Sequence, residues 1–272
     1  MPTEHKDLAV MLEIAVVAAR LAGQKAMEEI SYTKTSVKNN EELVTEADKH
    51  CQQIIIEQIK QKFSDHGIMG EEGDDGNMLK QPPRGSEDIW WVIDPIDGTN
   101  NFAHGVLNFT VSIAVMSQGK PIVGVVFEPA TDSMFTAVKD GPAQFNGVRI
   151  ETSGSDFDRF ECVGIESYFS KGSPDWILKM MGKIRCRGLG TTALHLAYVA
   201  KGSFLATVAS RAKIWDIAAG AFIAEQAGAL NTDWAGKEIF PVDLKNYNKE
   251  PFDILTANKK THGKLVEILS GR

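Results

Sequence analysis

Apolar residues recur at helical spacing in two segments of the first quarter of the chain. The first segment predicts a long amphipathic helix that ends near Gly23, with an apolar face formed by Val10, Ile14, Val17 and Leu21. After the polar stretch SYTKTSVKNNEE, a second helix is predicted, with an apolar face formed by Cys51, Ile55, Ile59 and Phe63. Asp48 falls at or near the start of this second helix, where a carboxylate interacts favourably with the helix dipole.

Continuous apolar runs replace the helical pattern from residue 89 onward. The run IWWVI is typical of a central strand. FTVSIAVM and IVGVVFEP are joined by the turn residues QGKP, and MFTAVKDGPAQFNG predicts another hairpin. Beyond residue 155, strand-like and helix-like segments alternate, which favours an α/β layer. We therefore predict an α+β or α/β protein, with an N-terminal α+β domain over residues 1–148 and a C-terminal α/β domain over residues 149–272.

Composition and charge narrow the classes of function. The 272 residues are 43% hydrophobic and 24% charged, as in an ordinary globular protein. A net charge of −7 disfavours nucleic acid as a partner, because such a surface needs clustered Lys and Arg. The three cysteines are widely spaced, which is typical of reduced thiols. Since the polar N-terminus MPTEHKD is no secretory signal and Arg20 interrupts the most apolar helix, we expect a cytoplasmic protein with no membrane association.

The stretch WVIDPIDGTNNF, residues 91–102, joins an apolar strand to two aspartates, Asp94 and Asp97. Burying carboxylates beside a hydrophobic strand is costly unless a cation meets them. Three more acidic positions stand at the ends of predicted elements: Asp48, Glu71 with Glu72 beside it, and Asp216. Each alone has an ordinary explanation as a turn, a solvated loop or a helix cap. Together these hard oxygen ligands favour a Mg²⁺ site completed by the oxygens of a phosphate.

The residues of DPIDGT have separable roles in this interpretation. Asp94 is predicted to end the strand, and Pro95 to stop the ladder of hydrogen bonds. The carbonyl of Ile96 would then be free to face a cation. Gly98 permits a close backbone approach to phosphate, and the hydroxyl of Thr99 could orient a water.

Spacing tests one competing chemistry. Phosphatases of the haloacid dehalogenase type also carry Asp-Gly-Thr, but only one residue separates their two aspartates. Here two residues, Pro95 and Ile96, stand between Asp94 and Asp97. The pattern therefore disfavours a phospho-aspartyl intermediate.

Four landmarks occur in order along the chain: LVTEAD (43–48), GEE (70–72), WVIDPIDGTNNF and WDIAAG (215–220). With these, the sequence resembles the inositol monophosphatase superfamily of lithium-sensitive, Mg²⁺-dependent phosphomonoesterases. The resemblance implies an alternating αβαβα sandwich of two domains, a homodimer, and a small phosphorylated substrate.

The resemblance also implies roles for individual residues. One metal would be held by Glu71, Asp94 and the Ile96 carbonyl, and a second by Asp94, Asp97 and Asp216. A third, looser ion would contact Glu71 through water. The attacking water would be activated near Glu71 and Thr99, with Asp48 hydrogen-bonded to Thr99. The backbone amides of Gly98 and Thr99 would hold the phosphate.

Departures from the family pattern concern the substrate. Members that prefer inositol phosphate usually carry a glutamate a few residues before Trp-Asp, and here the matching position is Ala209. Arg211 and Lys213 make this segment basic, either as a solvated loop or as contacts to a second anionic group of the substrate. Thr192 stands where the family places a small residue near the ring, and Asn100 replaces the Thr often found after Gly-Thr.

Inositol-1-phosphate is the first substrate expected from the resemblance. The alternatives are fructose 1,6-bisphosphate, a 3′(2′),5′-bisphosphate nucleotide, or a family member that acts as a protein- or RNA-binding module. The intact acidic set favours catalysis. His195 lies in an apolar helical run and is expected to be a core residue, as are Trp90, Trp91 and Trp215.

Overall fold

The computed structural model describes residues 5–32, 35–38, 42–74, 77–85, 87–169 and 172–270. Its helices are α1 (His5–Glu29), α2 (Glu46–Lys62), α3 (Thr99–Ala103), α4 (Asp175–Met181), α5 (Thr192–Ala200), α6 (Ile214–Gln226) and α7 (His262–Ser270), with a 3-10 turn, η2, at Pro129–Thr131. No helix in the described ranges is both long and apolar enough to cross a bilayer.

Two mixed sheets dominate the structure. The eight-stranded sheet has the order β10 (Val148–Arg149), β9 (Gln144–Phe145), β8 (Ser133–Val138), β7 (Lys120–Glu128), β6 (Thr110–Ser117), β5 (Ile89–Asp97), β3 (Gly67–Gly70), β4 (Leu79–Gln81). The five-stranded sheet has the order β12 (Arg185–Arg187), β11 (Cys162–Ile165), β13 (Ala206–Ala212), β15 (Phe252–Asn258), β14 (Ala229–Thr232). A separate hairpin pairs β1 (Thr35–Lys38) with β2 (Glu42–Thr45).

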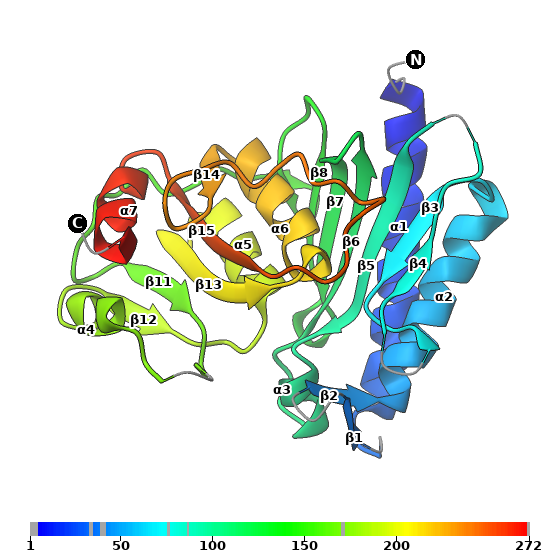
Figure 1. The fold of residues 1–272 in the computed structure, drawn as a ribbon, viewed down its shortest axis with the longest axis horizontal. Helices are drawn as coiled ribbons and strands as arrows, with labels where there is room; N and C mark the ends of the chain where they lie inside the picture. The colour runs from blue at the N-terminus through cyan, green and yellow to red at the C-terminus, as the bar shows by residue number, and fades with distance from the viewer. Residues whose placement is uncertain are drawn as a thin grey trace.

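These elements form five alternating layers, as expected for an αβαβα sandwich (Figure 1). Helices α1 and α2 cover one face of the large sheet, and α5 and α6 lie between the two sheets. Helices α4 and α7 cover the outer face of the small sheet. The fold class predicted from the sequence is therefore confirmed, as are the hairpins β6–β7 and β8–β9.

Hydrophobic burial explains the layering. One cluster joins α1 and α2 to the large sheet, a second packs α5 and α6 between the sheets, and a third lies under α4 and α7. His195 and Trp90, Trp91 and Trp215 are buried in the core, as expected. The last strand of the large sheet ends at Arg149 and the first of the small sheet begins at Cys162. The division into domains at residues 148 and 149 stays a prediction.

The predicted end of the first helix is wrong. The helix continues six residues past Gly23, to Glu29. Gly23 serves packing here, because a Cβ at this position would lie 2.7 Å from the ring of Phe127. A glycine that allows a helix to approach a sheet closely has the same sequence signal as one that ends a helix.

The predicted end of the central strand at Asp94 is also wrong. Strand β5 continues through Pro95 to Asp97, and its pairing with β6 shifts register between these two aspartates. Asp94 lies opposite Ser112, and Asp97 opposite Thr110. Pro95 therefore interrupts the ladder as a bulge would, without ending the strand.

Candidate active site

Two parallel strands bring Glu71 and Asp94 together. Strands β3 and β5 run in the same direction, with Gly70 opposite Ile93. Glu71 follows β3 directly, and its backbone N–H donates to the carbonyl of Ile93 at 3.2 Å. Because parallel strands present their carboxyl ends at the same sheet edge, the acidic loop and the DPIDGT turn meet there.

Asp216 reaches the same region from the middle helical layer. It lies in the first turn of α6, and its carboxylate accepts a hydrogen bond from the backbone N–H of Lys213 at 2.7 Å. The hydroxyl of Ser112, which is opposite Asp94 on β6, donates to the carbonyl of Trp215 at 3.1 Å. Ser112 thereby ties the start of α6 to the strand position of Asp94.

Asp97 is held by the start of α5. Its Oδ2 accepts hydrogen bonds from the backbone N–H of Ala193 at 2.7 Å and from the hydroxyl of Thr191, and its Oδ1 accepts the N–H of Thr192 at 3.3 Å. Thr110 adds a longer bond of 3.4 Å. A buried carboxylate at a helix N-terminus is stabilised by these donors and by the helix dipole.

Asp48 and Thr99 come together across 51 positions of sequence. The Thr99 hydroxyl lies 3.3 Å from Asp48 Oδ1 and 3.1 Å from the carbonyl oxygen of Ile96, so one proton has two acceptors. The other oxygen of Asp48 accepts the N–H and hydroxyl of Thr45, at 2.8 and 2.6 Å. Asp48 is thus fixed within the first turn of α2, with one oxygen directed at Thr99.

Gly98 provides the turn between β5 and α3. Its φ of +102° is a conformation that side chains with a Cβ rarely adopt. A Cβ here would also lie 3.2 Å from the carbonyl oxygens of Asn108 and Gly190. The turn therefore needs glycine for both its dihedral angle and its close backbone contacts.

Burial and mutual repulsion raise the pKa values of the carboxylates. Burial raises the pKa of Asp94 well above its ordinary value, and the charges of its acidic neighbours Glu71, Asp97, Asp216 and Asp48 raise it further. Burial raises the pKa of Asp97 to about 6 against its hydrogen bonds, and that of Asp216 to about 7 with a further contribution from the Asp97 charge. Burial raises the pKa of Asp48 to about 6, although its bonds to Thr45 act in the opposite direction.

The donor set of this cluster fits a divalent cation. The side chains are carboxylates, the ligands preferred by Mg²⁺, and a cation would offset the repulsion that raises their pKa values. Within the described residues, however, no three acidic, imidazole or thiol side chains are arranged as an assembled metal site.

The predicted substrate contacts have different surroundings. Arg211 is exposed at the end of β13 with φ +55°, and its N–H donates to Asp253 at 3.0 Å. The ammonium of Lys213 donates to the carbonyl of Lys249 at 3.0 Å, which holds the side chain against that backbone. Thr192 contacts Asp97 through its backbone N–H at 3.3 Å, and Ala209 is buried on β13.

Sequence reasoning missed the residues that position the acidic ones. Thr191 holds Asp97 and also caps α5, accepting the N–H of Leu194 at 3.3 Å. Gln52 of α2 holds the loop after β3, because its side chain accepts the N–H of Glu72 at 3.0 Å and donates to the Glu72 carbonyl. The one sequence signal for Thr191 was that a threonine just before a helical apolar run is a common N-cap residue. Nothing local in the sequence indicates the partner of Gln52.

Comparison with known proteins agrees with this architecture. The model of the inositol monophosphatase family matches residues 7–271. A fructose-1,6-bisphosphatase/inositol-1-monophosphatase of Thermotoga maritima is 39% identical over 232 residues, which are 84% of this chain and 83% of the relative. Nus factor SuhB of Vibrio cholerae is 35% identical, over 83% of this chain and 86% of the relative.

A solved structure extends the likeness to three dimensions. The extragenic suppressor protein suhB of Bartonella henselae superposes with a TM-score of 0.85 at 29% identity, covering 96% of this chain and 98% of that one. The family match spans nearly the whole chain, and the landmarks WVIDPIDGTNNF and WDIAAG fall where β5 and α6 bring their aspartates together. The chain belongs to the inositol monophosphatase family.

Proposed function

We propose that this protein is a Mg²⁺-dependent phosphomonoesterase that transfers the phosphoryl group of a small ester to water. The observation that carries the proposal is the convergence of buried carboxylates at the end of β5, next to a hydroxyl held by Asp48. A cluster of like charges is costly to bury unless it serves a cation. The name of the Thermotoga maritima relative supports the same reaction class.

The metal ligands in this proposal are Glu71, Asp94, the carbonyl of Ile96, Asp97 and Asp216. They would hold two Mg²⁺ ions, with a third contacting Glu71 through water. When bound, Mg²⁺ supplies positive charge that stabilises the phosphate oxygens as the ester bond breaks. Asp94 is the most buried of these carboxylates, at 2% exposure. In this proposal it would be shared by two ions.

Thr99 and Asp48 have a positioning role for the attacking water. The Thr99 hydroxyl proton is directed to Asp48 or Ile96, which leaves oxygen lone pairs of Thr99 to accept a hydrogen bond from the attacking water. This water would give a proton to the Glu71 carboxylate as its oxygen bonds to phosphorus, and the ester oxygen would leave with its electron pair and take up a proton from solvent. The amides of Gly98 and Thr99 would hold the phosphate at the turn.

Inositol-1-phosphate is the first substrate that we propose, with fructose 1,6-bisphosphate and 3′(2′),5′-bisphosphate nucleotides next. A bisphosphate would need a second cationic contact, and Arg211, which is exposed at the end of β13, is the candidate that we test first. Replacing Arg211 by Ala should then reduce turnover of bisphosphates more than of monophosphates. Equal losses would remove Arg211 from substrate recognition.

The name of the SuhB relatives supports a different class of function, in which the fold acts as a binding module for protein or RNA. The acidic cluster favours catalysis, since a binding module has no need of it. Phosphate release with Mg²⁺ distinguishes the phosphatase from the binding module. The assay uses a panel of inositol phosphates, fructose bisphosphate, phosphoadenosine nucleotides and histidinol phosphate. Release from at least one ester supports the proposal, and release from none favours the binding module.

Three further properties belong to the same proposal and rest on the family resemblance. We infer a homodimer in the cytoplasm, and inhibition by Li⁺ at micromolar to millimolar concentration. Sedimentation velocity tests the dimer, and the phosphate-release assay with added LiCl tests the inhibition. Turnover that is indifferent to Li⁺ would count against the assigned metal chemistry.

A further inference from the structure

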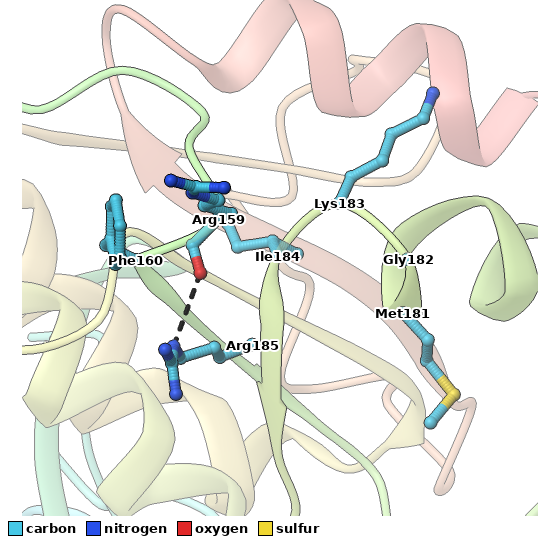
Figure 2. A pocket seen from close by; sticks show the side chains of 7 residues that line it. All are labelled: Arg159, Phe160, Met181, Gly182, Lys183, Ile184 and Arg185. Atoms are coloured by element: carbon cyan, nitrogen blue, oxygen red, sulfur yellow. Dashed lines mark hydrogen bonds between the residues drawn. The ribbon is translucent and has the colours of Figure 1, made fainter.

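A basic and apolar groove lies at the far end of the five-stranded sheet from the carboxylates. Strands β11, β12 and β13 are parallel, and Asp216 lies beyond the carboxyl end of β13. The groove is built from loops that precede the amino ends of β11 and β12 (Figure 2). It encloses about 390 Å³ and is lined chiefly by Arg159, Phe160, Met181, Lys183, Ile184 and Arg185.

Positive charge in the groove has no acidic partner. Arg159, Lys183 and Arg185 form no ion pair with any carboxylate in the described ranges of the chain. No acidic residue lines the groove. Residues 159–187 contain six Lys or Arg against three Asp or Glu, although the whole chain carries −7. The groove is therefore a local basic site on an acidic protein.

Apolar side chains are exposed around the same groove. The exposed fractions are 67% for Phe160 and 60% for Met181, and Leu178, one helical turn before Met181 on α4, is 79% exposed. Ile184 is buried beneath them. Exposed large apolar side chains beside cations with no acidic partner are typical of a protein interface rather than of an ordinary surface.

The loop that carries Arg159 and Phe160 is held in place. The Arg185 Nε donates to the carbonyl of Arg159 at 3.3 Å, and the Arg159 guanidinium lies 4.7 Å from the centre of the Phe160 ring (Figure 2). This guanidinium covers one face of the ring, which leaves a single face on which a nucleic-acid base could stack. An RNA strand would also need a longer basic track than three cations on a chain of net charge −7.

We propose that this groove docks an acidic segment of a partner protein, with an apolar side chain of that segment against Phe160 and Met181 and its carboxylates on Arg159, Lys183 and Arg185. A second copy of the chain is a poorer occupant. A twofold contact centred on the groove would set the cations of one subunit against those of the other. The proposal is independent of the phosphatase chemistry, because no groove residue contacts the acidic cluster.

A synthetic peptide array tests the proposal. Each 12-residue peptide holds four Asp or Glu and two Leu or Phe at varied spacing, and a matched array replaces the acids by Asn and Gln. We expect the full-length protein to be retained on the acidic array and not on the amide array. Fluorescence anisotropy with the strongest peptide should then show at least a tenfold weaker affinity for Arg159→Glu/Lys183→Glu, and weaker binding for Phe160→Ser/Met181→Ser.

A matched control changes the same charge elsewhere. Lys139 and Lys237 are exposed and outside the groove, so Lys139→Glu/Lys237→Glu should bind within twofold of wild type. All variants should keep the wild-type melting temperature and phosphate release. Equal retention on both arrays, or equal loss in the control variant, would overturn the proposal. Tighter binding of a 12-nucleotide RNA, or dimerisation abolished by the groove variants, would assign the groove to RNA or to a second copy instead.

Discussion

The carboxylate of Asp97 accepts a hydrogen bond from the backbone N–H of Ala193 at 2.7 Å, across 96 positions of sequence. This bond joins the end of β5 in the large sheet to the first turn of α5 in the middle layer. A single aspartate therefore stabilises a helix start and contributes negative charge to the acidic cluster. Its geometry is set by the fold even before any ligand binds.

The contact between Thr191 and Asp97 predicts a stability difference between two adjacent threonines. Thr191 uses its side chain to bind Asp97 and to accept the N–H of Leu194, whereas the bond from Thr192 to Asp97 uses its backbone. We expect Thr191→Ala to lower the free energy of unfolding by about 0.5–2 kcal/mol, the usual cost of a lost helix cap. Thr192→Ala should cost less. Urea denaturation of both variants measures this, and equal costs would contradict the capping role.

His195 predicts an acid-dependent loss of stability. Burial lowers its pKa to about 4, and its Nε2 accepts the N–H of Leu189 at 3.0 Å, so the folded protein holds the neutral ring. The unfolded chain has an ordinary pKa near ~6.5 and takes up a proton first as the pH falls. This contribution is therefore fully present above pH ~6.5 and declines by on the order of 3 kcal/mol toward pH 4.

His195→Gln isolates that contribution, since glutamine offers an acceptor without titrating in this range. The unfolding free energies of wild type and variant, measured by denaturant titration from pH 7.5 to 4.5, should converge as the pH falls. A constant difference between them across this range would show that folding leaves the pKa of His195 unchanged, and would contradict the account.

The sequence predicts those features of the structure that depend on residues close together in the chain, and it fails for those that depend on distant residues. Apolar periodicity predicted α2, the hairpins and the αβ alternation, because these depend on neighbours in sequence. The end of α1 was mispredicted because Gly23 is required by its close packing against Phe127, which is 104 positions away in the sequence. Likewise, the acidic residues stood out by their places at element ends. Their supports Thr191, Ser112 and Gln52 have ordinary local sequences, and their roles come from contacts across the fold.

Mg²⁺ should stabilise the folded protein through the acidic cluster. An ion that binds only the folded state adds RT ln(1 + [L]/Kd) to the stability, or about 2.7 kcal/mol at a concentration 100 times Kd. We expect the melting temperature to rise with MgCl₂ in the millimolar range, and the rise to be much smaller in Asp216→Asn. Differential scanning calorimetry with matched NaCl separates this from a general salt effect. A rise of equal size in the variant would place the ion elsewhere.

The central claim is that the carboxylates at the end of β5 form the catalytic centre, and Asp94 tests it most directly. Its side chain is buried, and its carboxylate accepts the N–H of Ile96 at 3.1 Å, so asparagine preserves the size while removing the charge. Asp140→Asn, at an exposed position with φ +62° that asparagine tolerates, is the matched control.

The deciding measurement is the rate of phosphate release, with Mg²⁺, from the best ester of the panel. The account predicts a loss of at least ~10²-fold for Asp94→Asn, because a shared ligand supports both ions, and no loss for Asp140→Asn. Near-normal turnover by a folded Asp94→Asn protein would contradict it.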